Sequence, residues 1–218
     1  MFSLPTASLQ WTNLFRGGLP AEKFAFKTNF LHPAPTPGDG KGGYALFVGR
    51  LSVEKGLGVM LDAWRQLGGK IPLKILGDGP MSSLVTEAMQ EMPEIEWLGR
   101  RSLEEVYEVV GKAAFLVFPS EWYETFGRVA IEAFARGTPV VASNIGAITE
   151  LVDHKRTGMH FRPGDPTDLA AKIDWLLTHP LELSQMRTAV RAEFEHKYTA
   201  EDNYKRLMEI YQSVLCKP

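Results

Sequence analysis

The sequence contains a single cysteine, Cys216, so it can form neither an internal disulfide nor a zinc site built from several cysteines. It also lacks a long apolar run. The longest one, residues 113–118, has six residues, whereas a membrane-spanning helix needs about 20. The amino terminus lacks the basic stretch and apolar core of a signal peptide. These absences predict a cytoplasmic protein without a transmembrane segment.

The chain has no excess of basic charge, because 24 Lys and Arg residues stand against 26 Asp and Glu residues. A nucleic acid is therefore not an expected partner, since binding one requires cations that displace counterions from phosphates. No Walker A, G-x-S-x-G or H-E-x-x-H pattern occurs, and the five histidines are scattered without the spacing of metal ligands. P-loop, serine-hydrolase and zinc-protease chemistry are thus excluded.

What the chain does have is an ordinary globular composition, with 44% hydrophobic and 23% charged residues among 218. Residues 33–43, PAPTPGDGKGG, have no periodicity and are interpreted as a linker or exposed loop. The segment before them is too short to build a core. We therefore divide the chain into residues 1–42, a remnant of something larger with a linker, and residues 43–218, a full domain.

Beyond the linker, short apolar runs alternate with helical patterns. We expect strands at 44–48, 73–76, 95–98, 115–118 and 139–142, and helices at about 59–67, 81–90, 102–112 and 126–136. Ser102 with Glu105 forms a capping-box pattern. Two or three further helices follow, beginning at Asp165 or Thr167, after Pro180 and near Ala200. This series predicts an α/β fold in which a parallel sheet carries helices on both faces.

The loops that follow the strands are the expected ligand-binding positions of such a sheet. The first loop, residues 49–56, places Arg50 and Lys55 around a turn bounded by glycines. These two cations could clamp a diphosphate, which glycine backbone can approach closely. The alternative is a solvated turn in which both cations pair with Glu54.

The second loop, residues 77–80, reads GDGP and also opens a helix. It lacks the third glycine of a dinucleotide fingerprint, and none of the expected strands is followed by a complete G-x-G-x-x-G with an acidic residue about 20 positions further on. A dinucleotide-dependent oxidoreductase is therefore disfavoured.

The third loop, residues 119–127, reads PSEWYETFG and precedes a helix that contains Glu132. Glu124 lies at the mouth of this helix, where free backbone N–H groups attract anions and hydroxyl-rich ligands. Glu132 lies at the edge of the helix's apolar stripe, where a carboxylate needs a partner. Together they could accept hydrogen bonds from two parts of an elongated polyhydroxylated ligand. The alternative is that Glu124 is a helix cap and Glu132 a surface charge.

The order of GRLxxEKG, GDGP, Glu-x7-Glu within SEWYETFGRVAIEAFARGTPVVAS, and GAITELVDHKRTG resembles the carboxyl-terminal, donor-binding domain of the retaining glycosyltransferase family 4, also called group 1. The resemblance spans about residues 44–215, and residues 17–30 look like the exit from the amino-terminal domain. It implies one Rossmann-like, doubly wound half of a GT-B fold. The acceptor domain would be missing, and any peripheral membrane contact would come through it.

The resemblance also implies a role for each motif residue. Arg50 and Lys55 would bind the diphosphate and stabilise it as it leaves, and Glu132 would accept hydrogen bonds from the ribose. Glu124 would hold the donor sugar. The remaining expected contacts are backbone contacts, made at Gly49, Gly79, Arg101, Thr125, Phe126 and Gly127, with Arg101 nearest the base. Where the family usually has a second glycine in the GAITE segment, this chain has Ala147.

The implied activity is transfer of a hexose from a UDP- or GDP-linked sugar to an acceptor, with retention of configuration. No metal and no cofactor besides the donor are expected, since two cations replace the metal and the chain has no D-x-D motif. The isolated chain would be inactive, with Arg50, Lys55 and Glu124 as the catalytic residues of the complete enzyme. The alternative is a catalytically silent nucleotide-sugar-binding or sensor domain.

Overall fold

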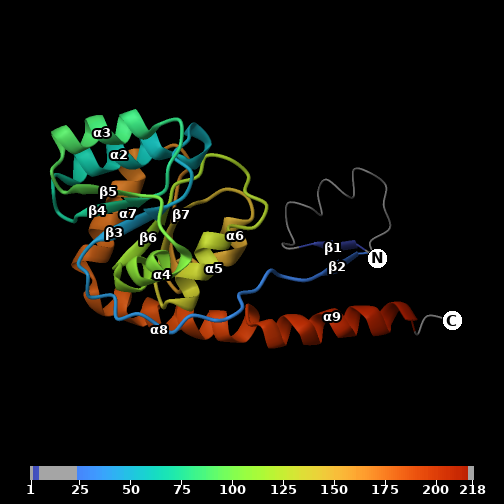
Figure 1. Cartoon of the computed structure of the whole chain (residues 1–218). Helices are drawn as coiled ribbons and strands as arrows, with labels where there is room; N and C mark the ends of the chain where they lie inside the picture. Colours follow the sequence, from blue (N-terminus) through green and yellow to red (C-terminus); the bar gives the residue numbers. More distant parts are fainter. Residues whose placement is uncertain (1, 5–23, 216–218) are drawn as a thin grey trace.

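The computed structural model describes residues 2–4 and 24–215. Its centre is a parallel sheet in the order β5-β4-β3-β6-β7-β8 (Figure 1). The strands are β3 (Ala45–Val48), β4 (Leu73–Leu76), β5 (Ile95–Gly99), β6 (Phe115–Phe118), β7 (Val140–Ser143) and β8 (Gly158–Phe161). This order runs outward in both directions from the neighbours β3 and β6, as in a Rossmann fold. The predicted doubly wound α/β class is confirmed.

Helices cover both faces of the sheet (Figure 1). They are α2 (Leu57–Leu67), α3 (Ser82–Glu91), α4 (Leu103–Lys112), α5 (Arg128–Ala135), α6 (Ile148–Leu151), α7 (Pro166–Thr178), α8 (Pro180–Lys197) and α9 (Ala200–Leu215), with a short 3-10 helix, η2, at Val53–Lys55. Neighbouring strand residues enter opposite cores. Phe47 packs with Trp64 of α2 on one face, whereas Leu46 packs with Phe134 of α5 on the other.

Helix boundaries follow their capping residues. The capping box at Ser102 is present, with the Ser102 hydroxyl accepting from the backbone N–H of Glu105 and the Glu105 carboxylate accepting from that of Ser102. Asp165, rather than Thr167, caps α7. The helix expected from residue 126 begins two residues later, because Gly127 has a left-handed φ of 85°.

In the main domain the sequence patterns do not predict η2, α6 or β8, each of which has only three or four residues. The same holds for two three-residue strands of the amino-terminal segment. So short a stretch shows no recognisable periodicity, and β8 is also an edge strand beginning with Gly158.

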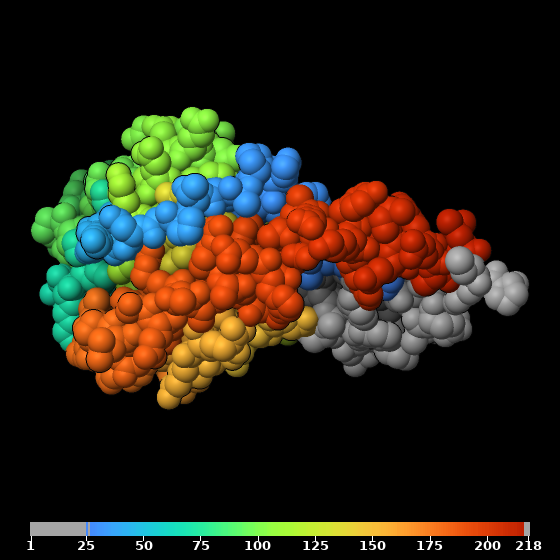
Figure 2. Space-filling view, turned by 90° about the horizontal axis from the view of Figure 1, so that it is seen from below, coloured from blue at the N-terminus to red at the C-terminus, as the bar shows by residue number. Residues whose placement is uncertain are grey.

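Residues 33–42 have no regular structure, as expected of the predicted loop, but they are fastened to the domain along their length. We call this segment the strap. The backbone N–H groups of Gly38, Gly40 and Gly42 donate to carbonyl oxygens at the ends of α5 and α4, at distances of 2.8 to 3.0 Å. The strap therefore lies along the helical face formed by α4, α5 and α8 (Figure 2).

The amino-terminal segment forms a second, small sheet in which β1 (Phe2–Leu4) pairs in parallel with β2 (Phe24–Phe26). Beyond β2 the chain contacts the start of α9: Lys27 Nζ donates to Asn203 Oδ1 at 2.9 Å, and Asn203 Nδ2 donates to the Thr28 carbonyl at 2.6 Å. Residues 17–23, the first half of the predicted exit segment, and Cys216 lie outside the described residues. Within residues 24–215, no helix combines the length and the apolar character that crossing a bilayer requires.

Candidate functional site

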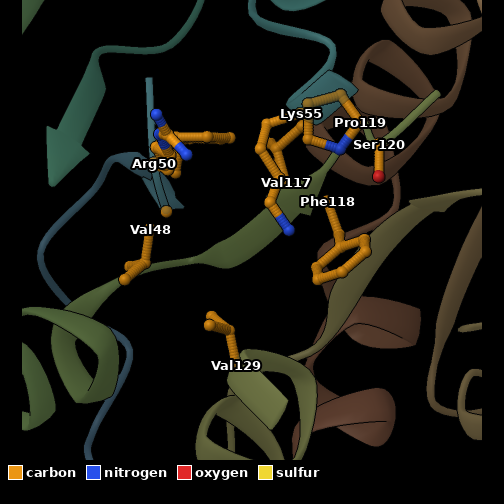
Figure 3. A pocket seen from close by; sticks show the side chains of 10 residues that line it. Val48, Arg50, Lys55, Val117, Phe118, Pro119, Ser120 and Val129 are labelled. Atoms are coloured by element: carbon orange, nitrogen blue, oxygen red, sulfur yellow. The ribbon is translucent and has the colours of Figure 1, made fainter. Parts of the chain in front are cut away.

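The sheet order reverses between β3 and β6, so the loops that follow these two strands face each other at one edge of the sheet. Between them lies a cavity of about 130 Å³. Arg50 and Lys55 line it from the loop after β3, Pro119 and Ser120 line it from the loop after β6, and Val129 of α5 lies across it from the two cations (Figure 3). The two loops predicted from the sequence therefore form one site.

The solvated-turn interpretation requires Arg50 and Lys55 to pair with Glu54. Neither of them forms an ion pair with it. Glu54 Oε1 instead accepts from the Ser52 hydroxyl at 2.6 Å, a bond that lowers the pKa of this exposed carboxyl. Arg50 is exposed and makes no hydrogen bond or ion pair with residues 24–215. A guanidinium without a partner at the mouth of a cavity can bind an anion.

Lys55 has a different partner, the carboxylate of Glu124, which lies on the loop after β6 and reaches it across the site. Both side chains are partly buried, with 29% and 20% of their surfaces exposed. Glu124 is not a helix cap, because Gly127 is the N-cap of α5 and no side chain caps this helix. The structure thus joins the two loops by an ion pair that the sequence analysis did not predict.

Glu132 is buried on α5, with 7% of its surface exposed, so the surface-charge alternative is wrong. Its carboxylate accepts from Arg128 Nε, one turn earlier, at 3.1 Å. Burial raises the pKa of Glu132, and the charge of Arg128 partly offsets this. Glu132 does not line the cavity that holds Lys55.

Two further cavities meet the first at Gly49. One, of about 240 Å³, has apolar walls from Val48, Leu76 and Val106 and is lined at its rim by Arg100 and Arg101. The other, of about 480 Å³, lies between Arg50 and the GDGP loop and includes Gly79. Arg50 and Arg101 therefore line adjoining cavities, so one extended ligand could occupy both cavities and reach both side chains.

Gly79 has a structural reason to be glycine. A Cβ at this position would come within 2.4 Å of the Leu51 carbonyl oxygen, which accepts a hydrogen bond from the backbone N–H of Met81. The absence of a side chain at Gly79 thus lets two loops of the protein pack against each other. Ala147 has a right-handed φ of −63°, so its departure from the family pattern causes no backbone strain.

The backbone before α5 presents donors to the site. In the described part of the chain, no acceptor contacts the N–H groups of Thr125, Phe126 and Gly127. The Phe126 ring is buried against Tyr198, with 6.4 Å between ring centroids, so only its backbone is available.

The sequence analysis missed several polar residues of the site: Ser120, Arg100, Arg128 and Ser143. Ser120 and Ser143 could have been suspected, because each is a hydroxyl at the end of an apolar strand. No three His, Cys, Asp or Glu side chains among residues 2–4 and 24–215 are grouped as a metal site requires.

The fold and the site define a Rossmann-like domain that carries the cationic side chains of Arg50 and Lys55 at its switch point. Residues 31–193 match the family model described as "Glycosyl transferases group 1", and the chain belongs to this family. An uncharacterized glycosyltransferase of Methanocaldococcus jannaschii is 30% identical over 81% of this chain and 50% of that protein. The glycogen synthase of Mycobacterium tuberculosis is 32% identical over 82% of this chain and 42% of that protein. The chain thus spans about half the length of these relatives.

Solved structures show the same fold. HepE of Anabaena, in complex with UDP-glucose, has a TM-score of 0.84 at 20% identity, over 96% of this chain and 63% of that one. A sucrose-phosphate synthase of Thermosynechococcus elongatus has a TM-score of 0.83 at 23% identity, over 98% of this chain and 58% of that one.

Proposed function

We propose that the chain is the carboxyl-terminal, donor-binding domain of a family 4 glycosyltransferase with GT-B architecture. The complete enzyme would transfer a hexose, with retention, from a UDP- or GDP-linked sugar to an acceptor. The observation that carries the proposal is the unpartnered Arg50 beside the Lys55–Glu124 pair at the switch point of the sheet. The UDP-glucose bound to the structurally similar HepE supports a nucleotide sugar as ligand.

In this proposal Arg50 and Lys55 bind the diphosphate and stabilise the negative charge that grows on it as the sugar departs. Glu124 accepts hydrogen bonds from the sugar, and the N–H groups of residues 125–127 donate to it or to the phosphate. Two fixed cations supply charge that a divalent ion would otherwise supply. We therefore expect the reaction to need no metal.

The nucleoside would occupy the cavity between Gly49 and α4. Its apolar walls suit a base, which would lie against the backbone near Arg101. Glu132 would accept hydrogen bonds from paired ribose hydroxyls. A buried carboxylate at this position disfavours its own ionised form, so a ligand that donates hydrogen bonds to it has a clear role.

Transfer also requires an acceptor held against the donor with water excluded, and orientation of the reactants alone can supply roughly 7 to 11 kcal/mol of the barrier reduction. Because the chain spans half of its relatives, we propose that it binds donor but transfers no sugar by itself. Joining it to an amino-terminal domain should produce activity that EDTA leaves intact. Binding without activity in such a complete protein would instead favour a silent sensor domain.

The first test is a thermal-shift panel of UDP, GDP, ADP and their glucose conjugates, because a ligand that binds only the folded state raises its melting temperature. Calorimetric titration then measures the affinity of the best ligand for the wild type and for Arg50→Ala. Lys112→Ala is a matched control, since Lys112 is exposed at the far end of α4. Equal binding to all three proteins would refute the proposed site.

A further inference from the structure

A chain of buried hydroxyl groups leads from the sheet to Glu124. Ser143, the last residue of β7, donates from its hydroxyl to the Ser120 carbonyl oxygen at 2.5 Å. The Ser120 hydroxyl in turn lies 3.1 Å from Glu124 Oε1. Both serines are buried, with 0% and 1% of their surfaces exposed. Glu124 is thus tied to a strand that contributes no side chain to the cavity.

The Ser120 hydroxyl has one proton and three acceptors within reach: Glu124 Oε1 and the Glu54 carbonyl oxygen, each at 3.1 Å, and the Trp122 carbonyl oxygen at 3.4 Å. The Glu54 carbonyl already accepts from the backbone N–H of Glu121 at 3.0 Å. The carboxylate is the stronger acceptor and gains more from the proton. The hydroxyl therefore donates to Glu124 and, together with Lys55 Nζ on the same oxygen, holds this carboxylate in its direction.

The same serine joins the two halves of the site. Its loop contacts Glu54, the residue before Lys55, through the Glu121 N–H. Gly56, which follows Lys55, packs against the backbone of Pro119 so closely that a Cβ there would lie 1.8 Å from the Pro119 carbonyl oxygen. A shift of Ser120 would consequently move Glu124 relative to Lys55, whereas Arg50, on the other side of the cavity, would keep its place.

We propose that Ser120 and Ser143 are positioning residues for the donor sugar: they hold Glu124 in the orientation that accepts the sugar's hydroxyl groups. This inference rests on the proposed function. Without the Ser143 hydroxyl, the buried Ser120 carbonyl loses its donor, and the loop must move to satisfy it. The sugar then loses its acceptor, while the diphosphate retains Arg50.

The experiment compares Ser143→Ala with Thr138→Val. Thr138 is an apt control, because its hydroxyl is equally buried and donates to a backbone carbonyl, that of Val110, at 2.7 Å. Both substitutions remove one buried hydroxyl, but only Ser143 is linked to Glu124. Calorimetry measures the affinities of UDP and UDP-glucose, or of the best-binding pair in the panel, and their ratio reports the contribution of the sugar. Melting temperatures monitor folding.

We expect Ser143→Ala to reduce the contribution of the sugar by about threefold to tenfold, the range for one hydrogen bond, without weakening UDP binding. Ser120→Ala, an independent variant, should have the same effect, and Ser143→Thr should restore the wild-type ratio. Thr138→Val should lower the melting temperature alone. An unchanged ratio, or equal losses for UDP and UDP-glucose, would overturn the inference. If the wild type binds no nucleotide at all, the proposed function fails instead.

Discussion

Lys55 and Glu124, 69 positions apart in the sequence, form an ion pair across the candidate site. Lys55 therefore has an ion-pair partner before any ligand arrives, whereas Arg50 has none within the ranges that the structure describes and feels the charge of the exposed Glu54 nearby. A diphosphate would first meet Arg50 and would then share Lys55 with Glu124. We therefore expect the two cations to contribute differently to the binding free energy of a diphosphate.

We expect Arg50→Ala to weaken binding of a nucleoside diphosphate by about 1.5 to 3 kcal/mol, the range for hydrogen bonds between charged groups. Lys55→Ala should cost at least as much, because it also leaves the negative Glu124 unpaired beside the phosphates. Adding Glu124→Gln to Lys55→Ala should recover part of the loss. Calorimetry checks all three. The free nucleoside is the control ligand, and equal losses for it would place the cations elsewhere.

We expect substitutions of Glu132 and Glu124 to affect the binding of different ligands. Glu132→Gln removes the charge that accepts from ribose, so we expect weaker binding of nucleoside diphosphates and unchanged binding of pyrophosphate. Glu124→Gln frees Lys55, so it should preserve or tighten diphosphate binding and weaken only the complete nucleotide sugar. Titrating all ligands against both variants tests this division. It is wrong if both substitutions weaken the bare diphosphate alike.

We also expect the buried, ionised Glu132 to lower the stability of the folded state. Because burial raises its pKa in the folded state, the ionised form is disfavoured, and this cost is fully present above the folded-state pKa. It disappears as the pH falls below the ordinary value of 4.5. Glu132→Gln should accordingly raise the melting temperature at pH 7, by about 2 to 4 °C per kcal/mol relieved, and lose this advantage at pH 4. A destabilised variant at pH 7 would contradict this.

His154 and His160, which the sequence analysis treated as isolated, are stacked with 5.7 Å between ring centroids. Burial is the main cause that lowers the pKa of each. Nearby charged groups are Lys155, Lys172, Asp153 and Asp168. His154 Nδ1 accepts from the His160 backbone N–H at 2.9 Å, which requires an unprotonated nitrogen.

The folded state thus prefers neutral histidines, and their stabilisation is complete above the ordinary pKa of 6.5 and is lost as the pH falls below it. We expect the melting temperature to decline between pH 7 and pH 5. His154→Asn should flatten this decline, since an amide oxygen can replace Nδ1 without titrating. His196→Gln, at an exposed position on α8, is the matched control. Parallel slopes for wild type and His154→Asn would refute the assignment.

We expect alanine substitutions at Gly79 and Gly58 to change the stability of the protein in opposite directions. Gly79→Ala would place a Cβ 2.4 Å from the Leu51 carbonyl, so we expect destabilisation by about 1 to 3 kcal/mol. Gly58→Ala on α2 meets no atom within 4 Å and should stabilise by about 0.5 to 1 kcal/mol. Denaturant titration measures both. A Gly79→Ala protein as stable as the wild type would show that the two loops separate easily.

The sequence predicted what depends on periodicity and local chemistry. The strands through Phe47 and Phe115 and the cap at Ser102 were correct because each is determined by neighbouring residues. The pairing of Lys55 with Glu124 depends on how β3 and β6 lie in the sheet, and no local pattern contains that information. The same holds for Ser143, which acts on a residue 23 positions away.

The strap is held by its main chain rather than by its side chains. Arg191 donates to the Pro35 carbonyl, Arg187 to that of Gly38 and Arg136 to that of Thr36. Any amino acid supplies a carbonyl oxygen, so related sequences can vary freely at positions 35 and 36 without loosening the strap. Gly38, Gly40 and Gly42 lack this freedom, because a Cβ there would come within 2.3 Å of the Gly111 backbone, the Arg187 guanidinium or the Tyr44 ring. We therefore expect related sequences to keep these three glycines and the three arginines that hold the strap, while the residues between the glycines vary.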